Sequence, residues 1–495
     1  MPRILLLAAL LHVIDVDCFA TKPNIFLEGP FKPVSEERSV VCEVSGTIPK
    51  NVKNSIFTRI GPNPMFSPCG GYHLFDGDGV VHWISFDNDT QATYHNRYVQ
   101  TRKLRAEKSA GRALYPTIGD FLKPFALLKI ALNEALKALG VLPNIPKSHL
   151  SVANTNIIQH ASKQLALCES GFPYSIEFTE IGLRTLGVET YGGFLKDAFT
   201  AHPKIDLKTG KMYGFGSNGS RDVRIYSFNS DGTPEKTYTV KLRKSILMHD
   251  FATTCEHLLL LDMPLEFNPK LLAQGKIPVL FEHSHSSRVG VLNKEDATGS
   301  SLRWYEVPGD SFLVSHVINS YADCGLITLI SCDMPSLSLQ NVCGSHSTLH
   351  KIVINTLTGD VTREPVLAPT KRSFDFPVIN DAKAGMNLKY AYVTEFKSGV
   401  PGDILKIDLH DATVAGSVQM EDGHYSGECV FVASSADCAD EDDGHLLSFV
   451  TSDEAESKLC IWDAQTMELV GEVTIPVRIP LGFHANMIAR QRACR

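Results

Sequence analysis

"KMYGFGSNGSRDVRIYSFNSDGTPEKTYTV", residues 211–240, alternates strand-length runs of branched and aromatic residues with turns rich in Gly, Asn and Asp. Such runs, separated by short turn sequences, predict antiparallel β-strands joined by hairpins. The same pattern occurs in residues 347–367 and 459–477. We therefore predict an all-β fold. Phrases such as "INTLTGDVTRE" resemble the hairpins of β-propellers, but no repeat is regular enough to count blades from the sequence.

The composition is that of an ordinary globular protein. The chain has 495 residues, of which 43% are hydrophobic and 21% are charged, so it can bury a large core. Its formal net charge is -8 and it contains no block of basic residues, which argues against nucleic acid as a partner. Twelve cysteines are scattered along the chain without a CxxC pair, so neither a zinc site nor a redox dithiol is expected from their spacing, and any disulfide pairing stays open.

The first twenty residues, "MPRILLLAALLHVIDVDCFA", have the features of a secretory signal peptide. Arg3 precedes a short apolar run, and Ala20 offers a small residue for cleavage. The run is too short to span a bilayer. We expect a secreted or lumenal protein, with a plastid location as the alternative, because a plastid leader that begins with a signal peptide would look the same.

One segment, at about residues 121–142, predicts an amphipathic helix. Pro124 stands at its first turn and Gly140 near its end. At about 100° per residue, the polar side chains share one side of the helix, and they are Lys123, Lys129, Asn133, Glu134 and Lys137. The opposite half is apolar and contains Phe125, Leu127, Leu128, Leu132, Leu136, Leu139 and Leu142. The pattern fits a helix packed on the core, or a helix lying in a membrane surface.

Four histidines adjoin apolar or small-residue stretches. They are His202 in "FTAHPKID", His249 in "SILMHDF", His316 in "FLVSHVINSY" and His484 in "IPLGFHANMI". A charged imidazolium would be costly in such places, and a neutral ring must find a partner. A lone buried histidine is usually a structural hydrogen-bonding group. Four of them far apart in sequence can share one metal only if the fold brings distant strands together, which the innermost strands of a propeller do.

Neutral imidazoles suit a borderline divalent ion such as iron, zinc or copper. Carboxylates around such a site accept the second N–H of each ring and fix its tautomer. Three acids in apolar or glycine-rich surroundings are candidates: Glu169, Asp375 and Glu428. Each could equally be a structural acceptor, and spacing alone does not decide between the two roles.

From near residue 45 to the end, the chain resembles the carotenoid cleavage oxygenases, a family of non-haem iron enzymes that split conjugated double bonds. The phrases that carry the resemblance occur in the family's order and include "SGTIPKNVKNSIFTRIGPNP", "GYHLFDGDGVVH", "ANTNII", "LALCESGFPY", "TAHPKID", "MHDFA", "FDFPVIN" and "IPLGFH". The resemblance implies a seven-bladed β-propeller with a helical cap over one face, formed as a single domain by residues 21–495.

The resemblance also implies a set of site residues. Iron(II) would be held by His202, His249, His316 and His484, and the acids around these ligands would be Glu169, Asp375 and Glu428. Many members have Glu at the position of Asp375, and many have proline at the position of Cys429. Thr155 matches a residue beside the iron that obstructs one coordination position.

The implied activity is dioxygenase cleavage of a carotenoid or apocarotenoid to carbonyl products, with O2 as co-substrate. Relatives with the same iron shell cleave stilbenes or isomerise and hydrolyse retinyl esters, so these reactions are alternatives. A non-enzymatic carotenoid-binding propeller is a third. The segment at 121–142 corresponds to the family's apolar patch at the mouth of the substrate tunnel, which implies peripheral contact with a membrane.

Overall fold

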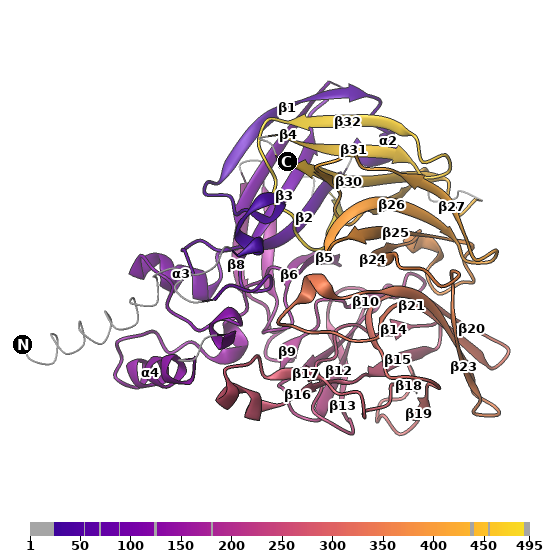
Figure 1. Cartoon of the computed structure of the whole chain (residues 1–495), viewed down its shortest axis with the longest axis horizontal. Coiled ribbons are helices and arrows are strands. Elements are labelled where there is room, and N and C mark those ends of the chain that lie inside the picture. The colour runs from indigo at the N-terminus through magenta and orange to yellow at the C-terminus, as the bar shows by residue number, and fades with distance from the viewer. Residues whose placement is uncertain are drawn as a thin grey trace, which may run out of the picture.

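The computed structural model describes residues 24–489, apart from 54, 69, 70, 89, 123–125, 180, 181, 436–439, 454 and 455. The expected signal peptide, residues 1–20, lies outside the described residues. The chain forms an all-β propeller whose sheets follow one another around a common centre (Figure 1).

Five of the sheets are separate from one another and have four or five strands each. The first has β5 (Asn156–His160), β6 (Lys163–Leu167), β7 (Tyr174–Thr179) and β8 (Gly182–Val188). The second has β9 (Ala198–Phe199), β10 (Lys204–Ile205), β11 (Met212–Ser217), β12 (Asp222–Phe228) and β13 (Pro234–Lys241). The third has β14 (Ala252–Thr253), β15 (His257–Asp262), β18 (Arg288–Asn293) and β19 (Arg303–Glu306).

The fourth separate sheet has β20 (Leu313–Asp323), β21 (Leu326–Met334), β22 (Thr348–Asn355) and β23 (Val361–Pro365). The fifth has β24 (Ser373–Val378), β25 (Tyr390–Lys397), β26 (Val400–Asp408) and β27 (Thr413–Val418). Strands β16 (Leu265–Phe267) and β17 (Val279–Phe281) lie between β15 and β18 in the sequence and pair with each other as a separate two-stranded sheet. Most pairs join consecutive strands in antiparallel register, as the turn-separated runs predicted.

The remaining strands form one ten-stranded sheet that joins the two ends of the chain. Its members are β1 (Arg38–Gly46), β2 (Ser55–Asn63), β3 (Asp78–Phe86), β4 (Gln91–Tyr98), β28 (His424–Tyr425), β29 (Val430–Ala433), β30 (Gly444–Ser452), β31 (Ser457–Asp463), β32 (Leu469–Ile475) and β33 (Ala485–Ala489). Strand β1 pairs with both β4 and β32, and β33 pairs with β2. In Figure 1 the yellow C-terminal strands accordingly lie beside the indigo β1. These pairings close the ring.

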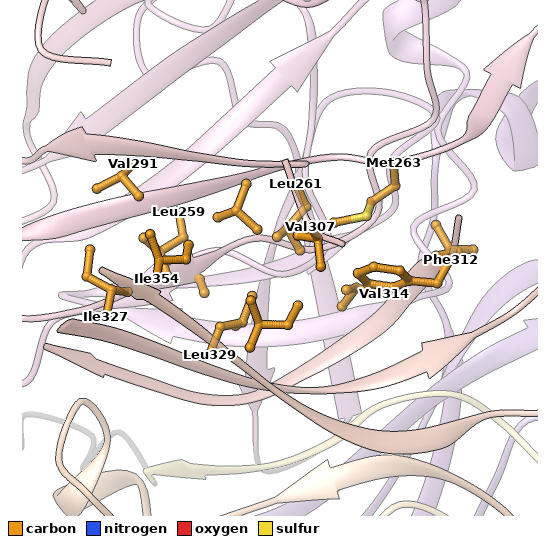
Figure 2. Packing of buried hydrophobic residues seen from close by; sticks show 14 of the residues in the cluster. Leu259, Leu261, Met263, Val291, Val307, Phe312, Val314, Ile327, Leu329 and Ile354 are labelled. Carbon is orange, nitrogen blue, oxygen red and sulfur yellow. The ribbon is translucent and has the colours of Figure 1, made fainter. Parts of the chain in front are cut away.

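The core consists of apolar layers between neighbouring sheets. Strand β15 is buried along nearly its whole length because each of its faces meets another sheet, and its side chains alternate between the two faces. Leu259 and Leu261 pack with Ile327 and Leu329 of the next sheet (Figure 2), whereas Leu258 and Leu260 belong to the preceding layer. Each such side chain contributes about 1.5–3 kcal/mol, so these layers fix the sheets against one another.

Helices are few and short. They are α2 (Lys50–Lys53), α3 (Arg102–Ala110) and α4 (Ala126–Ala138), with 3-10 turns η2 (Ile25–Leu27), η3 (Gly29–Phe31), η4 (Gly119–Leu122), η5 (Lys147–His149), η6 (Pro269–Gln274), η7 (Val342–Gly344) and η8 (Asp381–Lys383). Helices α3 and α4 lie together at one side of the propeller (Figure 1). Thr101 caps α3 through its hydroxyl, 3.1 Å from the Leu104 amide. None of the helices described is long and apolar enough to cross a membrane.

The predicted helix is present as α4, but its sides differ from the expected arrangement. Asn133, expected on the exposed polar side, is buried and donates to the Leu114 carbonyl at 2.6 Å. Leu136 is also buried, whereas Leu128 and Leu139 are 61% and 70% exposed. The Asn133 amide nitrogen finds an acceptor inside the protein, although its buried Oδ1 has no partner among the described residues. This helix therefore packs through a mixed face and leaves part of the apolar stripe in solvent.

Candidate metal centre

The four predicted histidines stand at corresponding places in four different sheets. His202 lies two residues before β10, His249 three residues before β14 and His484 directly before β33, whereas His316 lies near the start of β20. The structure brings all four predicted rings together, and their role as metal ligands stays a prediction.

The rings meet edge to face around one point. The His202 ring centre lies 4.6 Å from that of His249, 5.1 Å from that of His316 and 4.6 Å from that of His484. The Nε2 atoms of His249 and His316 are 3.2 Å apart. The ligand nitrogens of His202, His316 and His484 lie within 4.8 Å of one another. The His249 and His316 nitrogens are at hydrogen-bond distance, and the other separations are short enough for one cation to contact several of the rings.

Three of the rings meet a carboxylate on their outer side. Nδ1 of His249 lies 2.8 Å from Oε1 of Glu169. Nδ1 of His316 lies 2.6 Å from Oδ1 of Asp375. Each contact favours the proton on Nδ1 and leaves the lone pair of Nε2 directed inward.

The third carboxylate fixes two neighbours at once. Oε1 of Glu428 lies 2.9 Å from Nδ1 of His484, and its Oε2 accepts from the amide of Ala485 at 2.7 Å. The Glu428 carboxylate thereby holds both the imidazole and the start of β33. All three predicted acids thus contact one of the four histidines, and their role around a metal stays a prediction.

His202 differs from the other three because no carboxylate contacts its ring among the described residues. Its buried Nε2 has no hydrogen-bond partner in the described part of the chain. Burial and the three neighbouring imidazoles hold the pKa of His202 well below its ordinary value, so this ring is neutral. A neutral, buried nitrogen with a free lone pair is what a metal ion would complete.

The acids and rings also shift one another's protonation. Burial alone would lower the pKa of His249, but the contact with Glu169 outweighs it and raises that pKa. Burial alone would raise the pKa of Asp375, yet His316 holds it below its ordinary value. The pKa of Glu169 is likewise held below its ordinary value by His249, although burial alone would raise it. Glu169 and Asp375 are therefore ionised and can balance part of a divalent charge.

Asp375 reaches His316 although aspartate is shorter than the glutamate common at this position. Strand β24 shifts register between Asp375 and Val378, and Phe376 adopts a positive φ of 52°. The Phe376 amide also donates to Oδ1 of Asp375 at 2.8 Å. This local twist carries the shorter side chain to the imidazole, and it costs backbone strain because φ is positive at a bulky residue.

Thr155 also lies at the site, through its backbone. The His484 amide donates to the Thr155 carbonyl at 3.3 Å, and the Thr155 hydroxyl donates to Asn154 at 3.0 Å. Thr155 thus lies next to a ligand histidine, in agreement with the predicted neighbourhood. A blocking role stays a prediction.

Sequence reasoning missed Asp250, the residue after His249. Its carboxylate lies 2.7 Å from Nζ of Lys204 and accepts the Val317 amide at 2.8 Å. It therefore links the strands that carry His202, His249 and His316. The adjacency of a histidine and an aspartate in "MHDF" was the only signal, and it did not reveal these partners.

Two hollows adjoin the centre. A well of about 470 Å³ is lined at its inner end by His202, His316 and His484, and polar and apolar side chains contribute about equally to its walls. We call it the polar well because charged side chains such as Lys204 and Asp250 line it. A smaller, more apolar pocket of about 120 Å³ lies beside Glu169 and is lined by side chains such as Phe199, Met248 and Phe267.

A family model described as "RPE65: Retinal pigment epithelial membrane protein" matches residues 31–489. The chain is 33% identical over 504 residues to carotenoid 9,10(9',10')-cleavage dioxygenase 1 of Arabidopsis thaliana, which covers 96% of this chain and 91% of that protein. The chain belongs to the RPE65/carotenoid cleavage oxygenase family. Another family member, the probable carotenoid cleavage dioxygenase 4 of A. thaliana, labelled chloroplastic, is 33% identical across 94% of this chain and 81% of its own length.

Two solved structures share the fold. The lignostilbene dioxygenase of Pseudomonas brassicacearum superposes with a TM-score of 0.82 at 21% identity, over 95% of this chain and all of that one. The Synechocystis apocarotenoid oxygenase gives a TM-score of 0.78 at 22% identity, over 93% and 98% of the two chains. At these identities the likeness establishes the propeller and leaves the substrate open.

Proposed function

We propose that this protein is an Fe(II)-dependent dioxygenase that cleaves a conjugated double bond of a carotenoid or apocarotenoid to two carbonyl products. The observation that carries the proposal is the convergence of His202, His249, His316 and His484 with their Nε2 atoms inward. Relatives at 33% identity are named carotenoid cleavage dioxygenases, and an intact ligand set supports an enzyme over a simple carotenoid binder.

In this proposal the chain's own residues hold and orient the reactants. The four imidazoles bind iron, and Glu169, Asp375 and Glu428 fix three of the rings and offset its charge. Iron(II), when bound, would supply the one-electron chemistry that lets O2 react with a spin-paired hydrocarbon. No side chain need act as an acid or base in the cleavage.

The surroundings of the histidines suit an apolar polyene. The Phe376 ring centre lies 5.7 Å from that of His484 and 6.0 Å from that of His316. Phe483 precedes His484 and packs edge to face on Phe75 at 5.6 Å. Such aromatic walls align a flat conjugated chain and exclude water, which places one double bond beside the reactive position.

We also propose a seven-bladed propeller with a helical cap. Five separate sheets give five blades. The ten-stranded sheet divides into a blade of β29–β32, with the short β28 paired to the end of β30, and a blade of β33, β2, β3 and β4, and β1 bridges the two. Residues 21–495 form one such domain, and α3 and α4 belong to its cap.

Contact with a membrane surface is part of the proposal. Leu128 of α4 and Leu139, the residue directly after the end of α4, are both exposed. Relatives labelled chloroplastic support the plastid alternative for this chain, while the secretory location rests on residues 1–20 alone.

The proposal is tested by replacing single ligands. His249→Ala and His484→Ala are expected to lose bound iron and cleavage together, whereas His410→Ala, an exposed histidine outside the site, keeps both. Metal content by mass spectrometry and fragment analysis measure the two properties. Iron-free protein that still cleaves would contradict the proposal.

The substrate class is tested with β-carotene, an apocarotenal, a stilbene and a retinyl ester. Two aldehyde or ketone fragments from a carotenoid or apocarotenal support the proposal. Turnover of the stilbene or the ester alone would assign the same site to one of the other reactions.

A further inference from the structure

The polar well provides a route between solvent and the histidines that the proposed reaction does not use. Its inner end is formed by His202 and His484, which are buried, and its outer end by residues such as Leu207, Lys208 and Met386, which are exposed. The walls come from the innermost strands of several sheets, so the well follows the centre of the propeller.

Polar groups in and beside the walls of the well are held in place by hydrogen bonds. Asn319 of β20 donates to the Met386 carbonyl at 2.7 Å and accepts the Gly385 amide at 3.0 Å. Asn380 caps η8 through the Ala382 amide at 3.1 Å. The rim that contains η8 is therefore tied across to a neighbouring sheet, and the opening keeps its shape.

Most charges that line the well are neutralised in pairs. Lys204 pairs with Asp250 and Lys294 with Asp206, both at 2.7 Å. Asp381, at the rim, has no ion-pair partner among the described residues. Its side chain is exposed to solvent at the mouth of the well, where Lys204 and Glu428 also act on it electrostatically.

We propose that the polar well is the path by which a hydrated divalent metal ion enters the folded protein, with Asp381 attracting it at the rim. This rests on the proposed function, in which the four histidines hold iron. The histidines come from four sheets, so the binding site exists only after folding and the ion must cross the finished structure.

The alternative route is unfavourable for an ion. Moving a divalent cation through an apolar pocket removes its hydration shell, which costs far more than crossing water. A polar well keeps that shell until imidazoles replace it, and a carboxylate inside a low-dielectric opening concentrates cations and raises their association rate.

The test measures the rate of metal uptake. Purified full-length protein is stripped with a chelator, and binding of Co(II), used as the probe, is followed by its absorption. Asp381→Lys is expected to slow uptake about tenfold, and Ala384→Trp, which narrows the same rim, to slow it at least as much. Lys208→Glu, at the outer mouth, is expected to accelerate it. Final cobalt content stays at the wild-type value in all three.

Leu247→Trp is the matched control, because Leu247 lines the apolar pocket, and it is expected to leave uptake unchanged. Asp381→Asn removes the charge with little change in side-chain shape. The circular dichroism and Tm of the Asp381 variants are compared with those of the wild type, so that slower uptake is not mistaken for misfolding. Uptake at the wild-type rate in Asp381→Lys and Ala384→Trp, or slowing by Leu247→Trp alone, overturns the proposed path while the iron site stands. Equal cobalt content in wild type and His484→Ala would instead overturn the iron site itself.

Discussion

Asp375 shows how one residue adapts to a site built for a longer side chain. Its carboxylate meets His316 at 2.6 Å because the register shift in β24 and the positive φ of Phe376 move the backbone toward the imidazole. The contact between Asp375 and His316 offsets the backbone strain at Phe376. The packing of the Phe376 ring against Phe396, with ring centres 5.4 Å apart, offsets it further.

Asp375→Glu is therefore expected to weaken metal binding, although glutamate is common in the family. The extra methylene has no room at this separation, and overpacking displaces the His316 ring. A change in a group that orients a ligand typically costs 10–100-fold in affinity, so we expect about tenfold. Competition with a chelator of known affinity measures it.

The same exchange at an exposed position, Asp411→Glu, is the control and should leave metal affinity unchanged. Wild-type affinity in Asp375→Glu would mean that the twist at Phe376 does not set the position of His316.

At the scale of elements, α4 is the least regular part of the packing. It buries Asn133 and Leu136 and exposes Leu128 and Leu139. Lys137 lies over the Tyr115 ring at 5.7 Å and contacts Glu134 at 2.7 Å, so the polar residues of the helix serve its attachment to the protein. The exposed leucines have no such role.

The double variant Leu128→Ser/Leu139→Ser is expected to weaken binding to phospholipid vesicles at least tenfold. Each leucine contributes about 1.5–3 kcal/mol when fully removed from water, and partial insertion retains a part of this. Flotation with vesicles measures the bound fraction. Leu357→Ser, which removes a leucine that is 83% exposed elsewhere, should bind as the wild type does. Equal vesicle binding by the double variant would refute a membrane role for α4.

Sequence patterns predicted the strands and the α4 helix, because hydrophobic period and turn residues are local properties. They did not predict which side of α4 faces the protein. Asn133 is buried because the Leu114 carbonyl needs a donor there, and that carbonyl's position depends on distant packing. Likewise, the context of each histidine indicated a buried ring, but only the fold joins Glu169 to His249.

At the scale of the whole molecule, the ring is closed by β1, which pairs with β4 and β32, and the histidines connect four sheets at its centre. No local pattern in residues 38–46 indicated this closing role, because it depends on a partner more than four hundred residues away. An ion at the centre would therefore stabilise the association of sheets from all parts of the chain.

Removing the metal is accordingly expected to lower Tm. An ion that binds only the folded protein at a hundred times its Kd adds about 2.7 kcal/mol, which corresponds to a few degrees for a large domain. Scanning calorimetry with and without chelator measures the difference. His484→Ala should unfold at one temperature under both conditions. The same chelator-induced shift in that variant would show that the stabilising ion binds elsewhere.

The position of His484 also sets the order of events during translation. A ribosome that has reached residue 483 has already made three of the imidazoles and all three carboxylates, but β33 and the fourth imidazole are still missing. Shorter polypeptides, whether nascent or released early at a premature stop codon, have an incomplete ligand set. If the four histidines hold iron as proposed, only chains whose synthesis has passed residue 484 have the complete ligand set to retain it.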